Sequence, residues 1–291
     1  MASNDIVALG RKLALEGPHK LEKSPRRVRI LFDKKYIVDT QSAHYVWEHP
    51  YYPQYYIPLA SLEHVSRSSE THYSEGFTTL SLSSPTSSQS LPGCLLLTAG
   101  PLQDLLRIPF NSPGLTWFEE DSQIQVHPKD PYKRVDILPS TRNIKVTLPG
   151  KDGDVVLAES SNVANLFETG LPTRYYLPPT SVQDWALLQE SKTTTKCPYK
   201  GEANYYDVVV DGEAKRDLVW YYVNPTSESV AIAGRLCFYN EKVDVWIDGV
   251  KQERAVSKFG GDSTKFVKDM HKGGVPELGM STAKAMTGTP A

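Results

Sequence analysis

An internal repeat constrains the fold of this 291-residue chain more than any other feature. When residues 37–62 are set beneath residues 157–182, identical residues recur at a constant offset of 120 positions, without a gap. The matched pairs are Glu48 and Glu168, Tyr55 and Tyr175, Tyr56 and Tyr176, Pro58 and Pro178, and Ser61 and Ser181. Phe118 and Phe238 share the same offset near the far end. A shared offset at both ends predicts two copies of one domain, which also suits a chain of this length.

The chain divides into five segments on this basis. We predict an N-terminal amphipathic helix and lead-in at 1–25, a first and degenerate copy at 26–127, a linker at 128–141, a second and complete copy at 142–256, and a loosely attached tail at 257–291. Val28–Phe32 and Ile144–Leu148 alternate in polarity as half-buried strands do. We expect a mainly β fold with a minor α contribution, namely two small tandem antiparallel domains with one short helix each. Ser181–Glu190 is predicted to form such a helix, and Ser66–Ser90 a polar loop.

Charge and cysteine content limit the partners and the compartment. With 32 basic and 34 acidic residues the net charge is −2, and no long run of one sign occurs. This balance disfavours a nucleic acid or a membrane surface as partner and favours a small molecule. The opening residues predict an amphipathic helix instead of a signal peptide or membrane span. The three separated cysteines indicate reduced thiols, so we expect a cytoplasmic monomer or homodimer.

Four strings in the second copy resemble a known family. They are 167–172 (FETGLP), 174–178 (RYYLP), 195–201 (TKCPYKG) and 238–241 (FYNE). These strings resemble the domain-of-unknown-function family four-two-seven, which also bears the nominal label of nucleotidyltransferase family nine. The resemblance is close over 142–249 and partial over 26–62, as in a two-domain member. It implies a small β-tent fold and no known reaction.

Nucleotidyl transfer and metal binding are both disfavoured by the residues present. Nucleotidyl transfer needs paired carboxylates for magnesium and a phosphate cradle, and Gly260–Lys265 lacks the GxxxxGK[ST] spacing of such a cradle. No CxxC motif accompanies the cysteines, so no zinc site is expected. Six of the seven histidines precede the second copy. His44 and His49 are read as surface or turn residues in preference to shared metal ligands, so we expect neither metal nor cofactor.

The second copy nevertheless holds a set of reactive polar side chains. The predicted catalytic residues are Lys200, Glu168 and Tyr205, and the predicted substrate-binding residues are Arg174, Tyr175, Tyr176, Cys197, Trp220 and Tyr222. Lys200 precedes Gly201, and desolvation would lower the pKa of its amine and make it a base or Schiff-base nucleophile. The alternative is an ion pair between Lys200 and Glu168.

The other candidates also have two interpretations each. The guanidinium fork of Arg174 suits a carboxylate, supplied either by Glu168 or by a ligand. Cys197 is more consistent with an inert thiol than with a nucleophile, because no histidine lies nearby in the sequence. Tyr175 and Tyr176 would point to opposite faces of a strand, so at most one lines a pocket.

These features lead to one leading hypothesis and two rivals. The leading hypothesis is a cofactor-independent enzyme of the cyclase, isomerase or hydrolase type, acting on a small, partly aromatic or polyketide-like substrate by acid/base catalysis. The first rival is a binding module for an acidic ligand, and the second is a structural or interaction protein. The first copy would act as a scaffold or lid, with the aromatic run at 47–56 either walling the pocket or packing around its prolines.

Overall fold

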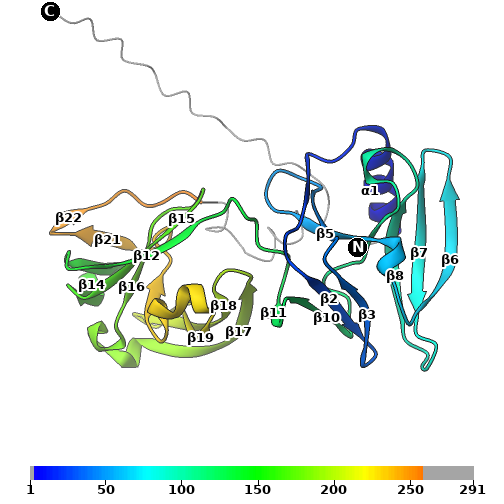
Figure 1. Ribbon diagram of the computed structural model, residues 1–291. Coiled ribbons are helices and arrows are strands. Elements are labelled where there is room, and N and C mark those ends of the chain that lie inside the picture. Colours follow the sequence, from blue (N-terminus) through cyan, green and yellow to red (C-terminus); the bar gives the residue numbers. More distant parts are fainter. Residues whose placement is uncertain (1–2, 258–291) are drawn as a thin grey trace, which may run out of the picture.

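The protein is mainly β and consists of two halves, as the computed structural model shows for residues 3–257 (Figure 1). Figure 1 places the first copy on the right and the second copy on the left. Every strand pairing within the four sheets is antiparallel. The predicted fold class of two tandem antiparallel domains is therefore confirmed. The tail predicted at 257–291 falls almost entirely outside the described residues.

The first copy contains a seven-stranded and a four-stranded sheet. The larger sheet has the order β1 (Lys20–Lys23), β4 (His44–Trp47), β5 (Gln54–Pro58), β9 (Leu105–Arg107), β8 (Ser90–Leu97), β7 (Phe77–Ser83), β6 (Ser66–Tyr73). The smaller sheet has the order β11 (Ser122–Ile124), β10 (Leu115–Glu119), β2 (Val28–Phe32), β3 (Lys35–Thr40). Two single turns of 3-10 helix, η1 (Leu59–Ser61) and η2 (Gly100–Leu102), join the strands.

The second copy repeats this arrangement. Its larger sheet has the order β12 (Val135–Ser140), β15 (Val163–Glu168), β16 (Arg174–Leu177), β20 (Leu236–Phe238), β19 (Glu213–Pro225), β18 (Gly201–Val210), β17 (Leu188–Cys197). Its smaller sheet has the order β14 (Gly153–Ser160), β13 (Ile144–Gly150), β21 (Asp244–Ile247), β22 (Val250–Lys251). Three 3-10 helices complete it, namely η3 (Pro179–Ser181), η4 (Trp185–Leu187) and η5 (Ser227–Ile232).

Each strand of the first copy has one counterpart in the second, in the same position of the same sheet. The duplication thus covers the backbone of the whole domain. The polar loop predicted at 66–90 contains β6 and β7 instead. In β7, buried Leu80 and Leu82 alternate with half-buried residues. The alternation of period two that is typical of a strand is present, but the many serines and threonines led to the prediction of a loop.

Two further predictions, one in the linker and one within the second copy, need correction. The helix predicted at Ser181–Glu190 is absent, and η3, η4 and the first residues of β17 occupy this segment. The Asp184 carboxylate accepts a hydrogen bond from the Ala186 amide and closes a short turn, after which Leu188 pairs with Val208. The predicted linker at 128–141 is shorter than expected, because its last part is β12, which pairs with β15.

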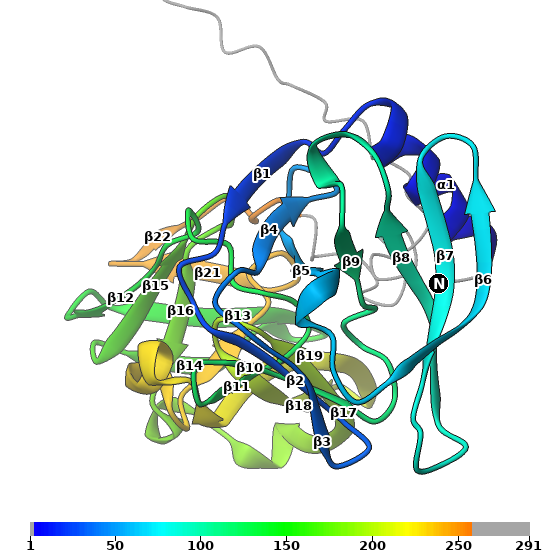
Figure 2. The same cartoon turned by 45° about the vertical axis from the view of Figure 1, so that its right-hand side comes forward.

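Apolar side chains form a core between the two sheets of each copy and a second cluster on the outer face of each larger sheet. In the first copy, the outer cluster lies beneath helix α1 (Ser3–Leu15), which Figure 2 shows against β7 and β8. Ile6 and Leu13 of α1 are buried there. In the second copy, the outer face carries the short helix η5, which contacts β12 and β19. The same surface is therefore covered differently in the two copies.

Replacement of Gly10 by alanine should destabilise the protein by about 1 kcal/mol, because α1 lies too close to the sheet to admit a methyl group. A Cβ atom at this position would lie 2.5 Å from the Phe77 ring and 2.9 Å from Leu95. In a solvent-exposed helix the same change would instead stabilise by about 1 kcal/mol. Chemical denaturation measures whether the free energy of unfolding falls or rises. A Gly10→Ala variant more stable than the wild type would contradict the close packing of α1 on the sheet.

Candidate functional site

Four aromatic side chains of the second copy lie on the outer face of its larger sheet. Tyr176, Tyr205, Trp220 and Tyr222 belong to the outer cluster, and each is at most 7% exposed. They share a face because side chains alternate along a strand and Tyr205 is paired directly with Trp220. The Trp220 indole donates a hydrogen bond to the Tyr176 hydroxyl over 3.0 Å. We call these four residues the aromatic face.

An ionic group lies beside the aromatic face. Glu168, at the end of β15, pairs through one carboxylate oxygen with the ammonium of Lys200 and through the other with that of Lys133 at 2.8 Å. The side chains of Glu168, Lys200 and Lys133 are 5%, 12% and 23% exposed, respectively. Lys200 comes from the turn between β17 and β18, and Lys133 from the linker. Segments that lie far apart in the sequence thus meet at one carboxylate.

The pairing holds both main partners in their charged forms. Burial acts to lower the pKa of Lys200, but the nearby Cys197 and Glu168 outweigh it, so the pKa is raised above its ordinary value. Burial acts to raise the pKa of Glu168, but Lys200 and Lys133 outweigh it, so this pKa is lowered. Lys200 therefore has the opposite pKa shift to the one expected of a general base.

Arg174 pairs with a different carboxylate from the one considered in the sequence. Its guanidinium donates two hydrogen bonds of 2.6 Å to Glu241 and a further one to the side chain of Asn240. The guanidinium also lies over the Trp220 ring, with 5.4 Å between the guanidinium carbon and the ring centroid. Glu168 is not its partner, because Lys200 and Lys133 already occupy both oxygens of that carboxylate. Arg174 thus borders the aromatic face with its charge matched by Glu241.

The remaining predicted residues lie in three different settings. Tyr175 packs against the core between the sheets while Tyr176 lies on the aromatic face, which confirms their opposite orientations. The Tyr205 hydroxyl forms a 2.7 Å hydrogen bond with the hydroxyl of Thr195. Cys197 is a half-buried free thiol at the end of β17. Of the predicted set, only Tyr175 lies away from this side of the sheet.

In the first copy, the equivalent carboxylate belongs to Glu48 and is buried. Glu48 accepts hydrogen bonds from Tyr56 at 3.0 Å and from the Arg107 guanidinium, and both members of the ion pair are buried. Arg107 is paired with Tyr56 in the sheet as Cys237 is paired with Tyr176, so a cysteine replaces this arginine in the second copy. The cations for Glu168 therefore come from a turn and a linker and not from β20, the counterpart of the strand that carries Arg107.

Sequence analysis missed three residues of this region. They are Lys133, Glu241 and Tyr199, whose hydroxyl accepts a hydrogen bond from the Asp130 amide at 2.8 Å. Glu241 belongs to the FYNE string, and it is the one acidic residue besides Glu168 in the four family strings, which could have marked it as a partner for Arg174. Lys133 gave no such signal, because it lies outside every repeated segment.

Two open cavities of the second copy lie away from the ionic group. One of about 200 Å³ is lined by Pro172, Tyr175, Asn240 and Arg254, among others. The other, of about 430 Å³, is lined by residues that include Glu190, Asp207, Arg216 and Asp217. The rings of the aromatic face are each at most 7% exposed, so a ligand that reached them would have to displace a side chain, and Lys133 is the most exposed member of the ionic group.

Residues 3–257 contain neither a cluster of metal-ligating side chains nor a membrane-spanning helix. No group of three or more His, Cys, Asp or Glu side chains in this range is arranged to hold a metal ion. No helix in the same range is long and apolar enough to cross a membrane.

Comparison with known proteins adds one match. A family model described as a domain of unknown function, DUF427, matches residues 20–76 and 136–249. The first stretch runs from β1 to the turn after β6, and the second runs from β12 to the turn after β21. The two stretches lie in the two copies and together cover more than half of the chain. No curated protein matches the chain.

Proposed function

The chain belongs to the family described as domain of unknown function DUF427, and we propose that its second copy binds a small organic anion with an aromatic body. The binding site would be the aromatic face together with Lys200 and Lys133. Rings would contact the body of the ligand, and the ammonium groups would pair with its acid group.

The observation that carries this proposal is the local imbalance of charge around Glu168. Two ammonium groups, those of Lys133 and Lys200, contact one buried carboxylate. Arg174 does not add to this excess, because Glu241 neutralises its charge. An excess positive charge beside buried rings favours an anionic ligand, since charge complementarity and ring contact then act together.

Turnover of such a ligand is the second candidate function, and the hydroxyl pair of Tyr205 and Thr195 favours it. In that case Lys200 would stabilise negative charge that develops on the substrate, because its raised pKa makes it a poor base. Incubation with a metabolite extract tests this candidate. Mass spectrometry should then find a compound that the wild type consumes and that a folded Lys200→Met variant leaves intact.

The binding proposal predicts that the wild type binds 2-naphthoate and discriminates against 2-naphthalenemethanol, which has the same rings but no charge. Lys200→Met should weaken binding of the acid by about tenfold or more, because one charge-assisted hydrogen bond is lost. NMR titration that follows the indole signal of Trp220 measures the affinity at the site.

Lys196→Met is the matched control, since Lys196 lies four residues earlier and its side chain is 54% exposed. This control should bind 2-naphthoate as the wild type does. Equal affinity for the acid and the alcohol, or unchanged affinity in Lys200→Met, would refute the proposal.

A further inference from the structure

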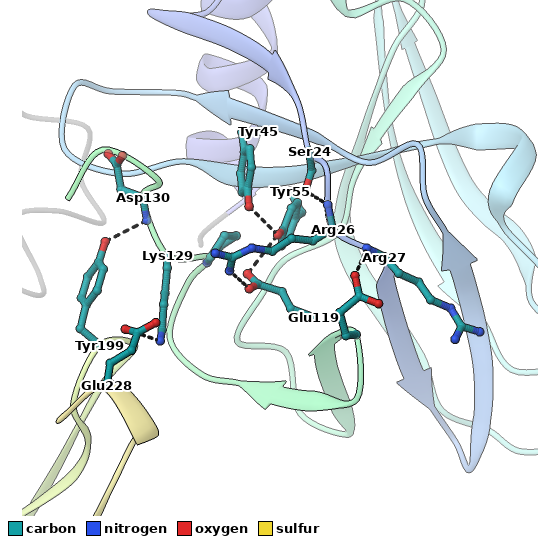
Figure 3. A network of polar contacts seen from close by, with 12 residues as sticks. Ser24, Arg26, Arg27, Tyr45, Tyr55, Glu119, Lys129, Asp130, Tyr199 and Glu228 are labelled. Atoms are coloured by element: carbon teal, nitrogen blue, oxygen red, sulfur yellow. Dashed lines mark hydrogen bonds and ion pairs between the residues drawn. The ribbon is translucent and has the colours of Figure 1, made fainter. Parts of the chain in front are cut away.

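The linker between the copies is held by residues of both. The Asp130 carboxylate accepts a 3.1 Å hydrogen bond from the indole of Trp47 in β4, and the Asp130 amide donates to the hydroxyl of Tyr199 in the second copy. Figure 3 shows the contact with Tyr199 next to a second one, the 2.9 Å ion pair between Lys129 and Glu228. Asp130 is thus fixed from opposite sides.

The same short segment forms a turn that places Lys133. The other carboxylate oxygen of Asp130 accepts a hydrogen bond from the Tyr132 amide at 2.8 Å, and its carbonyl accepts one from the Lys133 amide at 3.1 Å. The Tyr132 hydroxyl donates to Glu22 of β1 at 2.7 Å, which ties the turn to the first copy again. The position of the Lys133 backbone therefore depends on contacts with the first copy.

From this turn, the side chain of Lys133 reaches the ionic group of the second copy. Its ammonium lies 2.8 Å from Glu168 and 5.1 Å from the centre of the Tyr199 ring. Behind it, Glu168 and the four rings of the aromatic face are each at most 8% exposed. A ligand that approached from the linker side would meet Lys133 first.

We propose that Lys133 is a ligand-contacting gate of the second-copy site and that Trp47 of the first copy positions it through Asp130. This inference rests on the proposed function for its ligand, but the positioning part stands on the contacts alone. On this proposal, the first copy holds the linker in place. Lys133 can then close the site and provide its second positive charge.

The positioning part is tested without any ligand, by measuring the pKa of Glu168 with carboxyl-labelled glutamate in NMR. Lys133→Gln should raise this pKa, because one of the two cations is removed. Trp47→Phe keeps a ring in place but removes the hydrogen bond to Asp130, so it should also raise the pKa of Glu168, by a smaller amount.

The double variant Trp47→Phe/Lys133→Gln should show the same pKa as Lys133→Gln, because Trp47 acts only through Lys133. Trp246→Phe is the matched control. It removes a 3.3 Å hydrogen bond from another indole to Thr147, far from the linker in the sequence, and should leave the pKa unchanged. If Trp47→Phe does not fold, Asp130→Ala removes the same hydrogen bond. An unchanged Glu168 pKa in the folded variant would overturn the positioning role.

The gating part is tested with 2-naphthoate. Lys133→Gln should weaken its binding by about tenfold, and Trp47→Phe by a smaller factor in the same direction. If the wild type binds the probe and Lys133→Gln binds it equally well, Lys133 is not a gate. If the wild type binds no anion while Trp47→Phe still shifts the pKa of Glu168, the proposed function and the gate fail but the positioning role stands.

Discussion

Replacement of Arg107 by methionine is expected to lower the free energy of unfolding by about 3–5 kcal/mol, because it leaves the buried Glu48 carboxylate without its cation. The two side chains of this pair are only 6% and 8% exposed, so neither charge is solvated. Burial opposes the charge on Arg107, but Glu48 raises its pKa above the ordinary value, so the arginine remains charged. Urea denaturation of both proteins measures the loss.

Two further variants identify the cause of that loss. Glu48→Gln/Arg107→Met removes both charges and should recover much of the stability, because no unpaired charge remains buried. Arg142→Met breaks an exposed pair with Asp248 and should change the stability by less than about 1 kcal/mol. A double variant as unstable as Arg107→Met would show that the arginine stabilises by packing and not by neutralising Glu48.

The comparison of Glu48 with Glu168 explains why only one copy is a candidate site. Glu48 directly follows β4, and Glu168 is the last residue of the equivalent strand β15. In the first copy the cation comes from β9 of the same sheet, and Lys12 of helix α1 donates a hydrogen bond to the Glu48 carbonyl. In the second copy the cations come from a turn and a linker, whose side chains can move without disturbing a sheet. The carboxylate of the first copy is thus a structural ion-pair partner. In the second copy, a ligand could take the place of the carboxylate as partner of the lysines.

The sequence predicted those parts of the fold that depend on local pattern or on the repeat. The constant offset located both copies, and alternation located β2 and β13. The opposite orientations of Tyr175 and Tyr176 followed from strand geometry. The pairing of Lys200 with Glu168 was one of two interpretations that the residues left open. Each of these predictions needed only neighbouring residues or the matched positions of the two copies.

The missed features depend on contacts between distant segments. The partner of Arg174 is 67 residues away, and no periodicity relates the two. Lys133 reaches Glu168 from a linker that Trp47 and Tyr199 contact at Asp130, and such contacts leave no pattern in a single sequence. Strands β6 and β7 are rich in serine and threonine, a composition more typical of a loop. They are nevertheless strands, because their backbones pair with each other.

Acidification from pH 8 to pH 5 is expected to cost the wild type about 2 kcal/mol more than it costs a His127→Phe variant. The His127 ring stacks on Tyr52 with 3.9 Å between centroids, and its Nδ1 nitrogen donates to the carbonyl of Pro128 at 2.7 Å. Burial lowers the pKa of His127 from 6.5 to about 4. The unfolded chain therefore takes up a proton below about pH 6.5 while the folded protein does not, so stability is complete above that pH and is lost as the pH falls toward 4.

Phenylalanine preserves the stacking on Tyr52 but cannot be protonated, so the variant should lack this component of the pH dependence. Carboxylates that titrate in the same range affect both proteins equally and cancel in the difference. His64→Phe provides the control, because the His64 side chain is 57% exposed and makes no comparable contact with a neighbouring ring. Urea denaturation at several pH values measures the difference. Parallel stability curves for the wild type and His127→Phe between pH 8 and pH 5 would show that the folded protein accepts the proton, and that the contact between His127 and Tyr52 opens more readily than its burial indicates.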